Sequence, residues 1–168
     1  SDAISSLILL TPGFFWNERF RSVLSITENV IMDMISTFKL KPDRDFACIP
    51  VPMEATDFTL VDEWLDYIEQ DDLKTTFLTL KSARIMDEIQ EMSWQAMLAC
   101  RLPTLVILGE QDRIVDNRKV LQFLDPLFSE ASASRILSLT SGHAIHFEKT
   151  REVASAIVSF MRNLKDLH

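Results

Sequence analysis

The sequence after Arg101 alternates between apolar runs and amphipathic segments, and this alternation restricts the fold more than any other feature. The run "LPTLVILG" at 102–109 is typical of a buried strand, and "SRILSLT" at 134–140 is typical of a second one. The segments 117–128 and 148–164 carry the three- and four-residue apolar spacing of helices. Strands that alternate with helices in this way indicate a parallel α/β fold.

A third strand is indicated near the start of the chain. The run "ISSLILL" at 4–10 is apolar and is stopped by the turn residues "TPG". We therefore predict the α/β class, with parallel strands near 4–10, 104–109 and 134–140.

The long segment between the first two strands has a different texture. Apolar spacing predicts helices over 17–38, 59–73 and 74–92, with Thr59 as an N-terminal cap, whereas three prolines in 41–58 predict a loop.

This organisation divides the chain into two parts. We expect a helical cap over 14–94, inserted into an α/β core that is built from 1–13 and 95–168. We further expect the cap to overhang the carboxyl ends of the strands, because the insertion begins where the first strand ends.

Composition excludes several classes of protein. The net charge is −8 and no basic cluster occurs, which argues against partners that are nucleic acids or anionic membranes. No apolar run reaches the roughly 18 residues that a transmembrane helix needs. Cys48 and Cys100 match no zinc-binding spacing and favour a reducing compartment, so we expect a cytoplasmic protein.

Polar side chains follow two neighbouring strands at the point where each strand ends. Asp112 follows "LVILG" and His143 follows "ILSLT". Since ligands of open α/β sheets bind at the carboxyl ends of strands, we expect the two side chains to meet there. A carboxylate beside an imidazole fixes its tautomer and stabilises the imidazolium that forms during proton transfer. Asp116 is better explained as the cap of the helix that follows.

Each of these residues has a simpler explanation when it is taken alone. Asp112 is compatible with an ordinary turn aspartate, and His143 with a structural residue of a Gly-His turn. His143 and His146 have a spacing that would suit two metal ligands on a helix, but no third ligand lies nearby in the sequence. We therefore expect neither a metal nor a cofactor. The combination of an acid after one strand and a histidine after the next is more specific than either residue.

These motifs resemble the C-terminal part of an α/β-hydrolase, in particular the branch of monoacylglycerol lipases and lysophospholipases. The matching stretches are "LPTLVILGEQDRIVDNRKV" and "SGHAIHFEKTREVASAIVSFM". The resemblance implies that Asp112 is the acid and His143 the base of a Ser-Asp-His triad. "SSLILLTPG" resembles the strand that follows the family's nucleophile elbow, and 14–92 resembles its helical cap.

The departure from the family pattern is equally informative. The family's serine lies in G-x-S-x-G, upstream of the acid and the histidine. The three glycines of this chain, Gly13, Gly109 and Gly142, cannot form that motif. We expect the serine and the oxyanion hole to lie upstream of residue 1, and the chain alone to be inactive. We also expect it to pair with the missing N-terminal half or with a second copy of itself.

The implied function is hydrolysis of carboxylic esters with a small-molecule or lipid-like substrate. Phe14, Phe15 and Trp16 follow the first strand and are expected to lie near the ligand site. Two alternatives stay open. One is a non-catalytic binding or assembly module, and the other is a different chemistry on the same fold, such as thioester hydrolysis, dehalogenation or peptide cleavage.

Overall fold

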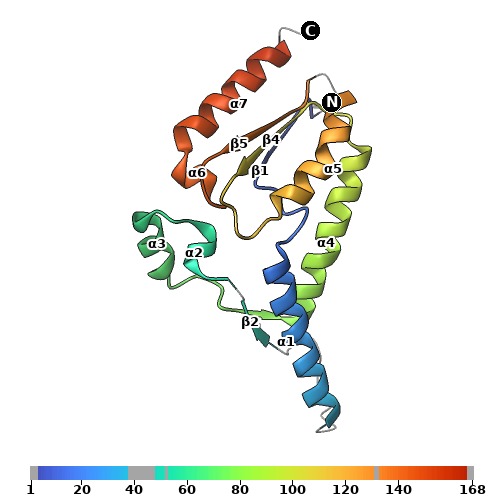
Figure 1. Ribbon diagram of the computed structural model, residues 1–168, viewed down its shortest axis with the longest axis vertical. Coiled ribbons are helices and arrows are strands. Elements are labelled where there is room, and N and C mark those ends of the chain that lie inside the picture. Colours follow the sequence, from blue (N-terminus) through green and yellow to red (C-terminus); the bar gives the residue numbers. More distant parts are fainter. Residues whose placement is uncertain (1–3, 38–47, 52, 131–132, 166–168) are drawn as a thin grey trace.

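The computed structural model describes residues 4–37, 48–51, 53–130 and 133–165. Its centre is a three-stranded parallel sheet in the order β1-β4-β5, which confirms the predicted α/β class (Figure 1). The strands are β1 (Leu7–Leu10), β4 (Thr104–Gly109) and β5 (Arg135–Leu139). The first strand begins later than predicted, and Ile4 is 74% exposed.

The middle strand is buried on both faces because helices cover both sides of the sheet (Figure 1). Ile107 of β4 packs against α7 (Thr150–Lys165), and its neighbour Val106 points to the opposite face, toward α5 (Asn117–Glu130). Continuous apolar runs are what parallel strands with two covered faces require. Each such side chain contributes roughly 1.5–3 kcal/mol to folding through burial.

The segment between β1 and β4 carries most of the remaining helices. We call the elements from α1 to α4 the helical block; they include α1 (Glu18–Thr37), α2 (Ala55–Phe58), α3 (Asp62–Glu69) and α4 (Leu80–Ala99). In Figure 1, α1 and α4 extend away from the sheet, while α2 and α3 lie on the side of α6. An ion pair joins the block internally, since Nη1 of the exposed Arg19 lies 3.2 Å from Oδ1 of the buried Asp57.

The prediction for this block is wrong in two places, because it contains a second, antiparallel sheet. The expected loop holds β2 (Cys48–Pro50), and the expected helix over 74–92 begins as β3 (Phe77–Thr79). The run "TTFLT" combines β-branched and aromatic residues, which favour a strand. The helix then begins at Leu80, because the Thr79 hydroxyl oxygen accepts the Ser82 N–H at 3.0 Å.

The expected role of Thr59 as a helix cap is also wrong. Thr59 is extended and closes α2, and its hydroxyl oxygen accepts the Val61 N–H at 3.2 Å. The next helix, α3, begins only at Asp62. Burial explains the difference, since Thr59 is only 1% exposed and is held by tertiary packing.

Two boundaries differ from the sequence-based expectation. The helix α4 continues without a break to Ala99, so position 94 lies inside one helix. The expected loop after β5 contains the short helix α6 (Ile145–Glu148).

Candidate active site

The acid loop follows β4 and holds Asp112 in one orientation. The Asp112 N–H donates to the Gly109 carbonyl at 3.0 Å, which turns the chain sharply after the strand. Its Oδ1 accepts two backbone N–H groups, from Ile114 at 2.8 Å and from Val115 at 3.0 Å. The side chain is 0% exposed. The second oxygen of the carboxylate therefore has a fixed direction.

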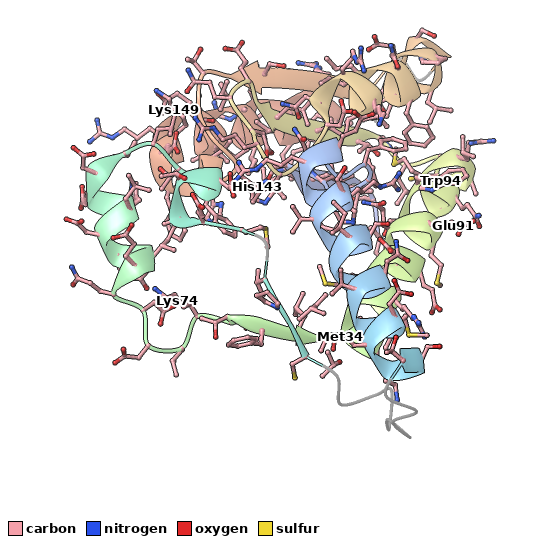
Figure 2. All side chains as sticks on the ribbon, turned by 60° about the horizontal axis from the view of Figure 1, so that its bottom comes forward. Met34, Lys74, Glu91, Trp94, His143 and Lys149 are labelled. Carbon is pink, nitrogen blue, oxygen red and sulfur yellow. The ribbon has the colours of Figure 1, made fainter. Side chains whose placement is uncertain are left out.

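That second oxygen faces the loop after β5. His143 Nδ1 lies 2.9 Å from Asp112 Oδ2, and this is the only hydrogen bond of the ring among the described residues. With the carboxylate as acceptor, Nδ1 carries the proton and Nε2 can accept one. In Figure 2, His143 lies where the sheet meets the helical block. The structure thus brings the two predicted residues together, and their catalytic role stays a prediction.

Asp116 lies outside this pair and directly precedes α5. Its Oδ1 accepts the Lys119 N–H at 3.1 Å, and Oδ2 lies 3.4 Å from Lys119 Nζ. Burial alone would raise the pKa of Asp116, but the hydrogen bonds and charge of Lys119, with the charge of Arg118, lower that pKa below its ordinary value. The residue is a helix cap, as the sequence predicts.

Two glycines let the acid and histidine loops touch. A Cβ atom at Gly109 would lie 2.1 Å from the Gly142 carbonyl oxygen, and one at Gly142 would lie 2.7 Å from the Phe58 carbonyl oxygen. Such contacts exclude any side chain at either position. Close backbone packing therefore sets the distance between the loops, and with it the distance between Asp112 and His143.

Thr11 links the end of β1 to the loop that carries His143. Its φ of 42° lies in the left-handed region, which is strained for a β-branched residue and costs about 1–3 kcal/mol. The Thr11 N–H donates to the Ile107 carbonyl at 2.8 Å, and its hydroxyl donates to the His143 carbonyl at 3.2 Å. Strain of this kind concentrates at functional sites, where surrounding contacts hold it in place.

The helical block covers the histidine loop. The Phe58 ring packs edge-on against the His143 ring with 5.9 Å between centroids, and the Phe58 carbonyl accepts the Ala144 N–H at 2.9 Å. Farther out, Trp64 of α3 stacks on Phe147 of α6 at 5.0 Å. The first two contacts restrict the face from which a ligand can reach the imidazole.

The predicted ligand residues Phe14, Phe15 and Trp16 lie beside the acid loop. Phe14 is buried, and both phenylalanine rings pack edge-on against Phe123 of α5. Trp16 forms a β-bridge with Val115. These contacts give the three residues a packing role, and a role in ligand binding stays a prediction.

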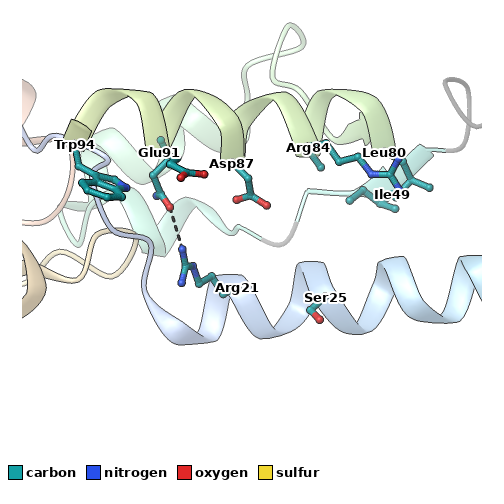
Figure 3. Close-up of a pocket in the computed structure, with 10 residues that line it drawn as sticks. Arg21, Ser25, Ile49, Leu80, Arg84, Asp87, Glu91 and Trp94 are labelled. Atoms are coloured by element: carbon teal, nitrogen blue, oxygen red, sulfur yellow. Dashed lines mark hydrogen bonds between the residues drawn. The ribbon is translucent and has the colours of Figure 1, made fainter. Parts of the chain in front are cut away.

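Several clefts border the helical block. One of about 600 Å³ opens beside Phe58 and is lined mostly by apolar side chains, with Glu54, Glu69 and Lys74 among the charged ones. Another of about 560 Å³ lies between α1 and α4 (Figure 3). In the second cleft Arg21 Nη2 donates to Gln90 Oε1 at 3.2 Å. Neither Asp112 nor His143 is part of the lining of either cleft. The first cleft is the better candidate for a substrate site, because Phe58 lines it and also contacts the His143 ring.

Sequence analysis missed four residues that shape this site: Thr11, Phe58, Asn117 and Glu148. The only local signal was for Asn117, which starts the helix after the acid loop. Thr11 and Phe58 act through contacts with the distant residues His143 and Ala144, and Glu148 acts on Gly142, six residues earlier in the chain.

The described part of the chain lacks two further features. None of its helices has the length and apolar character to cross a membrane. No group of three or more histidine, cysteine, aspartate or glutamate side chains there is arranged to hold a metal ion.

A parallel sheet covered on both faces, with an aspartate and a histidine on adjacent strand-end loops, defines the class of α/β-hydrolases. The family model Hydrolase_4, described as serine aminopeptidase S33, matches residues 1–150. The chain therefore belongs to this α/β-hydrolase family. No curated protein and no solved structure matches the chain significantly.

Proposed function

We propose that Asp112 and His143 are the acid and base of a serine hydrolase that cleaves carboxylic esters. His143 Nε2 takes the proton of the attacking serine and later returns it to the leaving alcohol. Asp112 holds the ring in the required tautomer and stabilises the imidazolium between these steps. The observation that supports the proposal is the 2.9 Å contact of His143 Nδ1 with a fully buried carboxylate.

The nucleophile is the part that this chain does not supply. None of the 168 residues lies in a G-x-S-x-G motif. We propose that the serine and the N–H groups of the oxyanion hole come from outside these residues. Since both are needed to form and stabilise the tetrahedral intermediate, the 168-residue chain alone turns over no ester.

The cleft beside Phe58 suggests an apolar acyl or lipid-like substrate. Its lining includes Met53, Ile68, Leu78 and Met86, and it borders the residue whose ring contacts His143. We propose the helical block as the cap of the site and this cleft as the space for the acyl chain. Apolar clefts with a few polar groups are the usual form of small-molecule sites.

Peptide cleavage is the second candidate, because the matching family is described as a serine aminopeptidase. An acyl transfer to water by the same acid–base pair serves an amide as well as an ester. The leaving group then distinguishes the two functions.

The test uses the protein that carries the serine. Asp112→Asn should lower kcat by about 10⁴, the loss given by the equivalent change in serine proteases. Asp116→Asn is the matched control and should leave kcat within about twofold, because its helix cap is kept. Turnover is measured on p-nitrophenyl esters of increasing chain length and on amino acid p-nitroanilides.

The outcomes of that test distinguish the proposed esterase from its alternatives. A drop of less than about tenfold in Asp112→Asn would show that Asp112 is structural and would refute the proposal. Turnover of the anilides alone would favour the aminopeptidase. His143-dependent ester turnover by the 168-residue chain would refute the assignment of the nucleophile to another segment.

The sheet has two edge strands, β1 and β5, and β1 is the one that we consider for a partner. Among the described residues, β1 pairs only with β4, and its four residues Leu7–Leu10 are half-buried. Exposed strand edges recruit further strands. We propose that this edge pairs with the N-terminal half or with a second copy, and light scattering that finds a stable monomer would refute pairing between copies.

The two thiols bear on the proposed compartment. Cys48 and Cys100 form no disulfide. We propose the cytoplasm, where reduced cysteines are the rule.

A further inference from the structure

Two side chains hold the glycines at the junction of the acid and histidine loops. Asn117, the first residue of α5, donates its Nδ2–H to the Gly109 carbonyl at 2.6 Å. Glu148, the last residue of α6, accepts the Gly142 N–H on Oε2 at 3.0 Å. Each side chain therefore fixes the glycine of its own loop from the helix that follows.

Both side chains leave one buried oxygen without a partner. Asn117 Oδ1 and Glu148 Oε1 are buried and make no hydrogen bond within the described part of the chain. A buried polar atom without a hydrogen bond is costly and rare in folded proteins. Each side chain thus keeps one hydrogen bond to its glycine at the cost of one buried oxygen without a partner.

A movement of Asn117 or Glu148 would reach Asp112 and His143 through the two glycines. The Gly109 carbonyl receives the Asp112 N–H as well as the Asn117 amide. Gly142 directly precedes His143, and the two glycines are so close that no Cβ fits at Gly109. A displacement of either glycine therefore moves Asp112 relative to His143.

We propose that Asn117 and Glu148 are paired positioning residues that set the contact between Asp112 and His143. Asn117 acts on the acid loop and Glu148 acts on the histidine loop. Their value for catalysis rests on the function proposed above, whereas their effect on the Asp112–His143 contact does not.

The two hydrogen bonds should respond in opposite ways when the side chain is replaced by an isosteric one. Asn117→Asp keeps the shape but removes the donor and places a carboxylate against a carbonyl. Glu148→Gln keeps an acceptor oxygen that can take the Gly142 N–H. The first substitution should disturb the pair and the second should preserve it, although both change the charge by one unit.

The experiment measures the pair itself by NMR on the full 168-residue chain. The readouts are the deshielded His143 Nδ1–H resonance and the exchange rates of the Asp112 and Gly142 amides. Exposed Asn29→Asp and Glu152→Gln are the matched controls. Circular dichroism confirms folding, and Asn117→Ala removes the donor without a new charge should Asn117→Asp not fold.

We expect Asn117→Asp to shift or abolish the Nδ1–H resonance and to speed exchange of the Asp112 amide about tenfold or more. Glu148→Ala should do the same to the resonance and to the Gly142 amide, and Glu148→Gln should restore both. Unchanged signals in Asn117→Asp and Glu148→Ala, or equal effects in the controls, would overturn the proposal.

A kinetic measurement separates this inference from the proposed function. In the protein that carries the serine, Asn117→Asp and Glu148→Ala should lower kcat with little change in KM, because substrate contacts are kept. If no hydrolase activity exists, the proposed function fails while the NMR result stands. If activity exists but the NMR signals do not move, only the positioning role fails.

Discussion

The junction of the two loops and the outer part of the helical block differ in how tightly their residues are packed. Around Asp112 and His143, strand ends, glycines and helix ends fit so closely that a single added carbon would clash. On α1 and α4, apolar side chains lie exposed instead: Val23, Ile26, Val30, Met34, Ile85, Ile89 and Met92. Figure 2 shows Met34 on α1, far out along the block from His143.

This contrast teaches where the chain restricts substitution. At the junction, hydrogen bonds and close contacts hold the backbone groups in place, so a small change should propagate to the contact between Asp112 and His143. On the outer helix faces few contacts depend on any one side chain. Sequence variation should therefore be tolerated on the exposed faces of α1 and α4 and should be damaging beside Gly109 and Gly142.

The largest expected effect is the difference in the free energy of unfolding when a buried and an exposed isoleucine are each replaced by alanine. Ile107→Ala removes a side chain that is 0% exposed and should lower the free energy of unfolding by about 2–5 kcal/mol. Ile26→Ala on α1, where the side chain is 63% exposed, should change it by less than about 0.5 kcal/mol. Urea unfolding of both variants measures the difference, and equal losses would show that the exposed faces are buried in solution.

The same contrast explains which features of the fold the sequence could predict. The strand β4 could be predicted because a strand buried on both faces needs a continuous apolar run, and β5 carries a similar run although it is only half-buried. Asp112 and His143 were found because parallel strands bring their carboxyl ends to one edge. Both arguments use local patterns that tertiary packing reinforces.

The sequence-based predictions are wrong or incomplete where tertiary contacts determine the local structure. The strands β2 and β3 have three residues each, too few for a reliable period. Thr59 carries a good capping side chain, but its burial commits it to an extended backbone. The role of Glu148 depends on Gly142, six residues earlier, and no spacing rule predicts that hydrogen bond.

A second pair of variants tests the close contact at the junction. Gly109→Ala places a Cβ 2.1 Å from the Gly142 carbonyl oxygen, so the backbone must move, at a cost of about 1–3 kcal/mol in unfolding free energy. Gly13→Ala is the control, because its nearest contact is the Trp16 side chain at 3.3 Å, which can give way. Thermal unfolding compares them, and a Gly109→Ala variant as stable as Gly13→Ala would show that the loops are not in contact.

A smaller effect is expected where the helical block touches the core. Trp64 stacks on Phe147 at 5.0 Å, and such pairs contribute about 0.5–1.5 kcal/mol beyond the area they bury. A double-mutant cycle of Trp64→Ala and Phe147→Ala should give a coupling of that size. A coupling indistinguishable from zero would mean that α3 is not docked on α6, and would place α3 with the loosely held part of the block.

The smallest expected effect concerns the charge of Asp116, at the border of the junction. Its folded-state pKa is lowered from 3.8, so the folded protein binds the proton more weakly than the unfolded chain does. The ionised carboxylate therefore stabilises the fold above about pH 4, and this contribution is lost as the pH falls through the lowered pKa. Asp116→Asn keeps a capping side chain and should lose only the charge, about 0.3–1 kcal/mol near neutral pH. Urea unfolding between about pH 7 and pH 3 should show the two proteins converge as the pH falls. A difference that grows toward low pH would mean that the carboxylate is held in its protonated form, and that Asp116 belongs to the tightly buried junction with Asp112.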